Sequence, residues 1–240
     1  MQLYGKGLLM TFTEVPSLIE HDFNEWYNNE HLDERINIPG FRRARRYEAI
    51  KANIKYLTTY EALDSNNIAS KDYLDVLKSP SDLSQIIMPQ FTKWHRMTCN
   101  VLIDQTHGMG AALTLIRFFP DPNKVVMLLD WLKNSVLEEL NRSPGITGSC
   151  VASVDLEADK RLANAFSQIS DPEQNIEWAI LVEGTNTNIT ETTSRNHLSD
   201  YLDTVIINKT KVIEESYLDT LENNKSKPRI PFGSLVELGI

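Results

Sequence analysis

The sequence predicts an α+β protein built from two β-α-β-β-α-β units that pack sheet to sheet. The first observation is an internal repeat: residues 24–41 (NEWYNNEHLDERINIPGF) resemble residues 129–146 (LDWLKNSVLEELNRSPGI) at an offset of 105 residues. The second is that a short apolar run rich in β-formers precedes each copy at the same offset. The third is the length, because 240 residues, 41% of them hydrophobic, suffice for two units with a real core.

The first unit is predicted to contain four strands and two helical segments. Residues 6–16 form an apolar strand, and residues 21–38 form a helix because they lack internal Gly and Pro and end at a Pro-Gly stop. The remaining elements are strands at residues 39–49 and 56–62, a polar helical segment at 65–78 and a closing strand at 93–103.

The second unit is predicted to repeat this order. Its elements are a strand at residues 111–121, a helix at 123–142, strands at 144–154 and 178–184, a helical segment at 185–206 and a closing strand at Arg229–Ile240. The third strand is offset by 122 residues from its counterpart, so this unit has 17 additional residues between strands two and three. This excess, within residues 155–175, is a lid, a contact surface or a longer connection, and the three alternatives stay open.

This element order is the ferredoxin-like one, and two such units usually cover each other's bare sheet face. The run E-W-Y-x-x-E-H-x-x-x-R-x-x-I-P-G-F-x-x-A-R-R-Y, followed by Y-L-x-x-Y-E, resembles the dimeric α+β barrel superfamily, near the EthD-like and stress-responsive A/B-barrel proteins. The resemblance is specific over residues 5–103 and architectural over 110–240. It implies an intramolecular barrel, a fused pseudo-dimer, with a pocket between the sheet and the helices of a unit.

The repeat provides an internal control for the helix of the first unit. Tyr27, His31 and Arg35 are spaced four residues apart and share one helix face. Their counterparts at the 105-residue offset are all apolar: Leu132, Val136 and Leu140. The face that must meet the sheet in the second unit is therefore polar in the first, which indicates a hydrated pocket or satisfied hydrogen bonds.

The third strand differs between the units in the same sense. Thr58 and Tyr60 share one strand face, and they correspond to Ile180 and Val182. We therefore expect residues 1–105 to be a functional half with a polar pocket and residues 106–240 to be an apolar, structural half. Two other interpretations stay open: His31 is a satisfied core histidine, or the helix turns its polar stripe to solvent.

These residues predict a cofactor-independent enzyme of the lyase or isomerase type. His31 would act as general acid or base on a small aromatic or polyketide-like carbonyl or phenolic compound, with Tyr27 and Tyr60 as the other catalytic groups. The expected substrate-binding residues are Arg35, Thr58, Glu30 and His95.

Other functions stay open, because relatives implied by the resemblance include isomerases, cyclases, decarboxylases, dehydratases, cofactor-free monooxygenases and haem proteins. The first alternative is a non-catalytic small-molecule binding or stress-response protein. The second is a haem-binding protein, with His31 or His95 reaching iron, or a cofactor-free monooxygenase.

Composition limits the partners. The formal net charge of −9 and the pI near 5.1 disfavour nucleic acid and anionic membranes, and no run approaches the 18 apolar residues of a membrane span. Two distant cysteines and no signal-peptide cleavage pattern favour a cytoplasmic protein. The only basic run, Arg42, Arg43, Arg45 and Arg46, splits between two strand faces and is expected to pair with surface acids, with one arginine left for an anionic ligand.

Sequence motifs that bind nucleotides or metals are absent. The chain has no glycine-rich phosphate loop, HExxH, CxxC or GxSxG sequence, so we expect no cofactor and no metal. The expected partner is a small-molecule ligand or substrate. A homodimer of the fused chain stays open.

Overall fold

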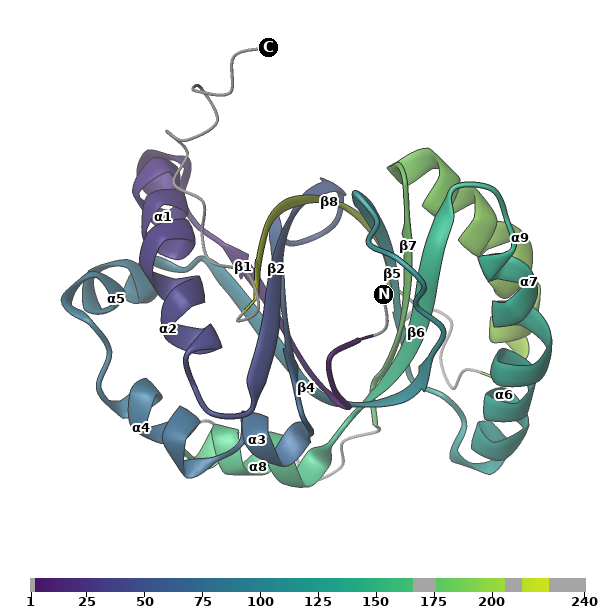
Figure 1. Cartoon of the computed structure of the whole chain (residues 1–240), viewed down its shortest axis with the longest axis horizontal. Helices are drawn as coiled ribbons and strands as arrows, with labels where there is room; N and C mark the ends of the chain where they lie inside the picture. Colours follow the sequence, from purple (N-terminus) through teal and green to yellow (C-terminus); the bar gives the residue numbers. More distant parts are fainter. Residues whose placement is uncertain (1–2, 166–175, 206–212, 225–240) are drawn as a thin grey trace, which may run out of the picture.

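The computed structural model describes residues 3–165, 176–205 and 213–224, and its strands close into a barrel (Figure 1). The strands are β1 (Gly7–Glu14), β2 (Phe41–Lys51), β3 (Tyr56–Ala62), β4 (Lys93–Asp104), β5 (Ala112–Phe118), β6 (Ile146–Val154), β7 (Trp178–Gly184) and β8 (Ile213–Asn224). Their order around the barrel is β1-β3-β2-β8-β5-β7-β6-β4, with antiparallel neighbours throughout.

The barrel consists of two four-stranded sheets joined at two seams. The first half has the order β4-β1-β3-β2, and the second half has the equivalent order β8-β5-β7-β6. The seams are the β2–β8 and β4–β6 pairings. Closure leaves no free strand edge among the described residues. The predicted fold, an α+β intramolecular barrel, is confirmed.

Seven of the strands overlap the segments expected from the sequence, and β8 does not. The closing strand expected at Arg229–Ile240 lies outside the described residues. Instead, β8 occupies the position beside β2 and β5. Its sequence, IEESYLDTLENN, is rich in acidic residues and does not predict a strand, because acidic residues are depleted in strands.

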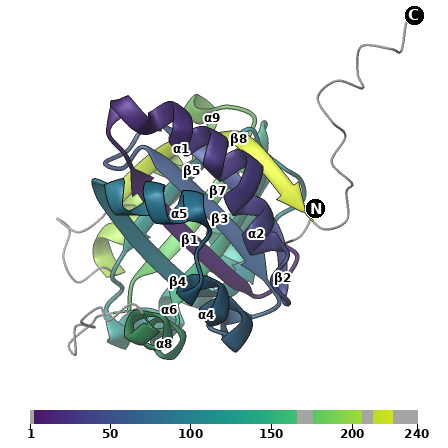
Figure 2. The same ribbon diagram turned by 90° about the vertical axis from the view of Figure 1, so that its left-hand side faces the viewer.

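Helices cover the outer faces of both sheets (Figures 1 and 2). In the first half they are α1 (Glu20–Trp26), α2 (Leu32–Ile36), α3 (Ser65–Ile68), α4 (Lys71–Lys78) and α5 (Asp82–Ile87). In the second half they are α6 (Val125–Trp131), α7 (Leu137–Asn141) and α9 (Thr187–Val205), whereas α8 (Leu156–Ala165) packs against the first half. Short 3-10 turns occur at Ser17–Ile19, Met88–Gln90 and Pro122–Lys124.

The repeated helix contains a π segment in both halves. Tyr27–His31 joins α1 to α2, and Leu132–Val136 joins α6 to α7, at the same 105-residue offset as the sequence repeat. Each helix ends at a Pro-Gly turn in which the glycine has a positive φ, 95° at Gly40 and 86° at Gly145. These turns are the predicted helix stops, because only glycine adopts this backbone conformation without strain.

Strand alternation separates a core inside the barrel from a core under the helices. In β1, Leu8, Met10 and Phe12 pack inside the barrel, whereas Leu9 packs toward α1 and α2. The second half has its own apolar core under α6, α7 and α9, and this core includes Leu132, Val136, Leu140, Ile180 and Val182.

The arginine run of β2 does not pair with surface acids as expected. Arg42 is exposed, but Arg43, Arg45 and Arg46 are 1%, 2% and 2% exposed. Arg43 and Arg45 point into the barrel, where Arg43 Nε donates to Glu61 Oε1 at 2.7 Å and Arg45 Nη1 donates to Glu183 Oε2 at 2.5 Å. The prediction of surface partners was wrong because both acids are buried: Glu61 lies opposite Arg43 on the adjacent strand β3, and Glu183 comes from β7 of the other half, which the sequence does not align with β2.

The additional residues of the second half form a contact with the first half. Leu156–Ala165 is α8, and it packs beside α3, α4 and β4. Its Ala158 and Leu162 are fully buried in the core under the first-half helices. Of the three alternatives for the additional residues, a lid, a contact surface or a longer connection, α8 is a contact surface. Residues 166–175 lie outside the described parts of the chain.

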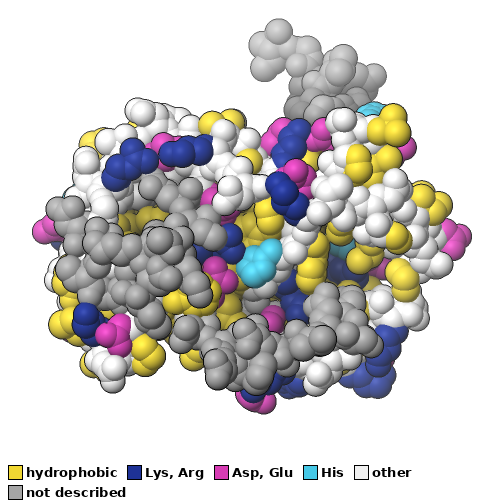
Figure 3. Space-filling view, turned by 180° about the vertical axis from the view of Figure 1, so that it is seen from behind, with side chains coloured by type: hydrophobic (Ala, Val, Ile, Leu, Met, Phe, Trp, Pro, Cys, Tyr) yellow, Lys and Arg dark blue, Asp and Glu magenta, His cyan; other side chains and the backbone are white. Residues whose placement is uncertain are grey.

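Two surface features bear on partners. Within residues 3–165, 176–205 and 213–224, no helix has the length and apolar composition needed to cross a bilayer. On the face shown in Figure 3, acidic and basic side chains are interspersed. The expected absence of nucleic-acid binding stays a prediction.

Candidate functional site

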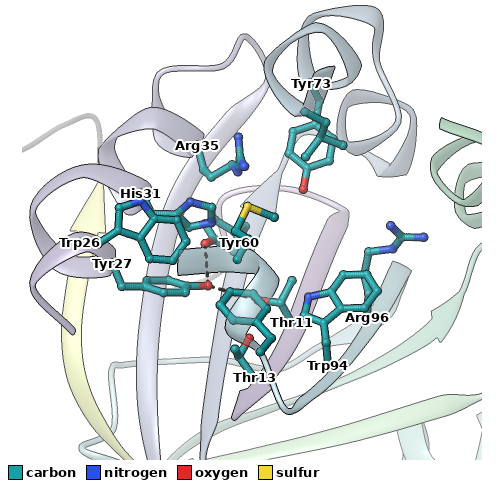
Figure 4. A pocket seen from close by; sticks show the side chains of 13 residues that line it. Thr11, Thr13, Trp26, Tyr27, His31, Arg35, Tyr60, Tyr73, Trp94 and Arg96 are labelled. Atoms are coloured by element: carbon teal, nitrogen blue, oxygen red, sulfur yellow. Dashed lines mark hydrogen bonds between the residues drawn. The ribbon is translucent and has the colours of Figure 1, made fainter. Parts of the chain in front are cut away.

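A cavity of about 40 Å³ lies between the sheet and the helices of the first half. Thirteen residues line it (Figure 4): Thr11, Thr13, Trp26, Tyr27, His31, Arg35, Tyr60, Tyr73, Leu77, Met88, Phe91, Trp94 and Arg96. Four of them were predicted from the sequence as site residues: Tyr27, His31, Arg35 and Tyr60.

Each wall of the cavity comes from a different element. Strands β1, β3 and β4 form the floor through the side chains that alternate away from the barrel interior. The α1–π–α2 helix supplies one side. The segment from α4 to Phe91 forms the roof with Tyr73, Leu77, Met88 and Phe91.

His31 is a buried imidazole without a complete set of hydrogen bonds. It is 8% exposed, and its Nδ1 atom has no hydrogen-bond partner. The ring centroid lies 4.4 Å from that of Trp26 and 4.8 Å from that of Tyr27. Burial, followed by the positive charges of Arg35 and Arg46, lowers the pKa of His31 well below its ordinary value of 6.5. The imidazole is therefore neutral at pH 7.

Glu34 lies between His31 and Arg35. Its Oε2 atom is 3.9 Å from His31 Nδ1 and 3.3 Å from Arg35 Nη1, and neither contact meets hydrogen-bond geometry. Burial raises the pKa of the Glu34 carboxyl, although the nearby Arg35 opposes this shift. Arg35 itself is 4% exposed and lies over the ring of Tyr73 at 5.5 Å.

Two tyrosines and a threonine form a chain of hydroxyl groups across the floor. The hydroxyls of Tyr27 and Tyr60 are 3.2 Å apart, and that of Tyr27 is 3.4 Å from Thr11 Oγ1. Either oxygen can donate in both contacts. Burial, and then the adjoining Tyr27, raises the pKa of Tyr60 well above its ordinary value. Tyr60 is therefore a neutral phenol that can donate or accept a hydrogen bond.

Arg46 lies beneath the helix and contacts Tyr27, the central member of this chain of hydroxyl groups. Its guanidinium donates to Asn24 Oδ1 at 2.6 Å and to Asn28 Oδ1 at 2.9 Å. It also lies 4.6 Å from the ring centroid of Tyr27 and 4.5 Å from that of Tyr56. Burial lowers the pKa of Arg46. This fixed charge holds Tyr27 in place and opposes protonation of His31.

Three predicted binding residues do not line the cavity. Thr58 shares a strand face with Tyr60 and is also buried, but its side chain is not part of the lining; it lies beside Thr11 and Arg46 in the sheet. Glu30 accepts a hydrogen bond from Ser81 Oγ and lines a separate outer groove between α1 and α5.

His95 faces the barrel and not the cavity. Because strand side chains alternate, its neighbours Trp94 and Arg96 line the cavity instead. The ring of His95 packs on Phe12 with centroids 5.5 Å apart, and Nε2 is 3.5 Å from Glu177 Oε2. His95 therefore lies on the barrel side of β4, and its substrate-binding role stays a prediction that this cavity does not support.

Two lining residues that were not predicted, Thr11 and Thr13, could have been found by the same comparison of the two halves. Thr11 and Thr13 correspond to Ile116 and Phe118 at the 105-residue offset, the same polar-to-apolar difference that identified His31. Arg96 required the facing of β4, and the roof residues required tertiary structure. Neither has a periodic signal in the sequence.

Haem does not fit the residues of this cavity. A pocket for a large planar cofactor usually has several hundred Å³; this cavity has about 40 Å³, so haem would require a far larger opening than a single aromatic ring does. His95, the other histidine considered as an iron ligand, does not line this cavity and packs on Phe12 on the opposite side of its strand. In the described parts of the chain, no cluster of three or more His, Cys, Asp or Glu side chains could hold a metal ion.

Comparison with known proteins finds similarity in structure but not in sequence. Family models and curated sequences give no match. An anthrone oxidase-like protein superposes with a TM-score of 0.67 at 10% identity, covering 95% of this chain and 97% of the other. A candidate monooxygenase from Lactobacillus acidophilus gives 0.57 at 9% identity, covering 91% and 96%. A candidate monooxygenase from Fusobacterium nucleatum gives 0.56 at 12% identity, covering 93% and 96%.

At these identities the similarity shows the fold alone. The matches extend over nearly the whole of both chains, so they include both halves and the barrel between them. The protein thus has the fold of the dimeric α+β barrel, ferredoxin-like proteins, closed within one chain.

Proposed function

We propose that the cavity is the active site of a cofactor-independent enzyme in which His31 is the general base. The substrate would be a small aromatic or polyketide-like phenol or ketone, bound in the functional half, residues 1–105, while residues 106–240 serve as the structural half. The observation that carries the proposal is the neutral imidazole of His31, buried with an unpartnered nitrogen at a cavity that also holds the Arg35 guanidinium.

The chemistry follows from this pair of groups. A neutral imidazole can take a proton from a phenolic hydroxyl or from a carbon beside a carbonyl. The resulting oxyanion is stabilised by Arg35, because charge attraction is strong in a buried site. Glu34, 3.9 Å from His31 Nδ1, is placed to stabilise the imidazolium that forms.

The hydroxyl chain of Thr11, Tyr27 and Tyr60 would orient the substrate oxygen. Its protons can reverse direction, because each contact permits either donor. A chain of this kind can return a proton to the product, as a lyase or isomerase requires.

A ring-sized substrate requires the cavity to widen. In its present volume of about 40 Å³ it holds water or a small group. Met88 and Phe91 in the roof are half-buried, and Trp94 is 38% exposed at the rim. Movement of this roof would therefore admit the substrate at low cost to the buried core.

A second candidate is a cofactor-free monooxygenase or oxidase. It uses the same first step, after which the carbanion gives electrons to dioxygen. The fold similarity to an anthrone oxidase-like protein and to two candidate monooxygenases supports this version. For anthrone the balanced reaction is anthrone plus O₂ to anthraquinone plus water.

The test is turnover of anthrone and of a panel of naphthols and aromatic ketones, followed by absorbance with and without O₂. We expect His31→Gln to lower kcat/KM by roughly 100-fold or more, as for removal of a general base. Because the pKa of His31 is depressed, kcat/KM should stay level from pH 8 to about 6.5 and fall only in acid.

His21→Gln is the matched control, since His21 is exposed on the same helix. It should retain the rate of the parent. Equal rates for His31→Gln and the parent would rule out the base assignment. Binding of panel compounds without turnover of any of them would favour the non-catalytic binding alternative.

A further inference from the structure

The titratable side chains that line the cavity are uneven in charge. Arg35 projects from α2 on one side, and Arg96 projects from β4 on another (Figure 4). Of the 13 described residues that line the cavity, none carries a carboxylate, and His31 is neutral. The cavity is therefore lined by two cations and no anion.

The acids that balance these arginines stand behind them, outside the cavity. Glu34 is 3.3 Å from Arg35 Nη1, and this buried nitrogen has no hydrogen-bond partner. Asp159 of α8 lies 3.4 Å from Arg96 Nε and Nη2, and it also accepts a hydrogen bond from Thr98 Oγ1 at 3.1 Å. The acids fix the positions of the two guanidinium groups, and neither acid lines the cavity.

Tyr73 connects the two cations. Its ring lies under Arg35 at 5.5 Å, and its hydroxyl points into the cavity between Arg35 and Arg96 (Figure 4). Burial raises the pKa of this phenol, and Arg35 and then Arg96 both oppose the shift. The fields of the two arginines therefore converge at the Tyr73 hydroxyl.

The rest of the lining is mostly aromatic. Trp26, Tyr27, Tyr60, Phe91 and Trp94 surround the space next to the cations. Flat apolar walls favour a ring, and guanidinium groups favour a planar carboxylate, with which each can form two parallel hydrogen bonds.

We propose that the cavity selects aromatic acids, with the carboxylate held by Arg35 and Arg96 beside the Tyr73 hydroxyl and the ring against the aromatic walls. The inference rests on the proposed function only in using the same cavity, and it names the substrate class. The second half contributes through Asp159 of α8, which makes Asp159 a positioning residue for Arg96.

The experiment compares two matched pairs of probes, 4-hydroxybenzoate with 4-hydroxybenzamide and salicylate with salicylamide. Within each pair the shapes are similar and only the acid is charged at pH 7. Binding to the full chain is followed by tryptophan fluorescence, since Trp26 and Trp94 line the cavity, and by titration calorimetry. We expect each acid to bind at least roughly tenfold more tightly than its amide.

Variants assign that preference to the arginines. Arg35→Leu, the residue of the second half at this position, and Arg96→Met should each reduce the acid-to-amide ratio toward one. Arg35→Gln is a second variant in case the leucine variant is unstable. Asp159→Asn should lower the ratio less than Arg96→Met, and restoring the carboxylate with Asp159→Glu should recover part of it. Arg142→Met, at an exposed arginine of the other half, should leave the ratio unchanged.

The outcomes separate this inference from the proposed function. Equal binding of acid and amide, no binding of either, or a preference that survives both arginine changes overturns the inference. If neutral phenols or ketones are turned over, and His31→Gln slows that turnover, while acids bind no more tightly than their amides, the proposed function holds and the inference is wrong. If acids are preferred but His31→Gln changes no reaction, the inference stands and the function falls.

Discussion

Burial of His31 carries a stability cost that depends on pH. Its folded-state pKa lies below the ordinary value of 6.5, so the unfolded chain binds a proton at a higher pH than the folded one does. The unfolded state therefore gains stability as the pH falls through about 6.5. Above that pH, protonation of His31 no longer affects the free energy of unfolding. The remaining cost is that of burying a neutral imidazole whose Nδ1 atom has no hydrogen-bond partner.

Replacing this histidine should therefore stabilise the protein. The change is His31→Val, the residue that the second half uses at the same position. At pH 7.5 we expect Tm to rise by roughly 2–4 °C, equivalent to about 1 kcal/mol for a chain of this size. The gain should increase between pH 6.5 and pH 5, as measured by calorimetry across that range.

His21→Val serves as the control for surface effects and should give no comparable gain. A fall in Tm of several degrees for His31→Val would mean that the imidazole holds a hydrogen-bond network together. The assignment of His31 as a functional residue would then lose its main support, the unpartnered nitrogen.

Comparison of the two halves could predict Tyr27, His31, Arg35 and Tyr60 as members of one polar site, because matched positions share a fold environment and differ only in chemistry. The same comparison also predicted Thr58, which does not line the cavity, and it offered no basis for Glu30 and His95, whose prediction had no counterpart argument. Their facing depends on helix rotation and strand register. These are set by packing across the whole sheet, and one sequence does not contain that information.

At the scale of elements, the sequence pattern placed most of the helices and strands, but it did not predict α5, α8 or the π segments at Tyr27–His31 and Leu132–Val136. A π turn adds one residue to a helix and changes which side chains face the sheet. Its presence in both halves, one polar and one apolar, associates it with the fold and not with the chemistry of His31.

The helix α8 shows how an added segment becomes part of another unit's core. Leu162 is fully buried under the first-half helices. We expect Leu162→Ala to lower the free energy of unfolding by about 2–4 kcal/mol, as buried leucines do. Chemical denaturation measures the change.

Lys160→Ala, a half-exposed neighbour on α8, should stay within about 0.5 kcal/mol of the parent. Equal effects for the two variants would show that α8 is not part of the cooperative core. The same helix carries Asp159, so its docking also determines the position of Arg96 in the cavity.

At the scale of the whole molecule, the two halves are connected by ion pairs inside the barrel. Arg45 of β2 meets Glu183 of β7, with side chains 2% and 10% exposed, and it also donates to the Gly110 carbonyl at 2.7 Å. These groups come from different halves, and the sequence alone could not pair them. Their partnership depends on barrel closure.

Removing one member should be more harmful than removing both. Arg45→Met leaves Glu183 buried without its cation, and we expect a loss of about 3–5 kcal/mol in the free energy of unfolding. The double change Arg45→Met/Glu183→Gln should recover part of this loss. A urea-denaturation cycle measures both values.

Arg142→Met breaks an exposed pair with Glu138 and should cost no more than about 1 kcal/mol. If Arg45→Met costs as little as this control, the barrel pair does not stabilise the joined halves.

Both barrel seams, β2–β8 and β4–β6, close within one chain. A barrel assembled from two identical chains would separate on dilution, and each substitution would enter both of its halves at once. Here closure of the barrel is independent of protein concentration. A substitution alters one half alone, so equivalent positions can differ, as Tyr27 and Leu132 do. Covalent linkage thus relieves the molecule of symmetry, and one ligand per chain is the stoichiometry that this arrangement predicts.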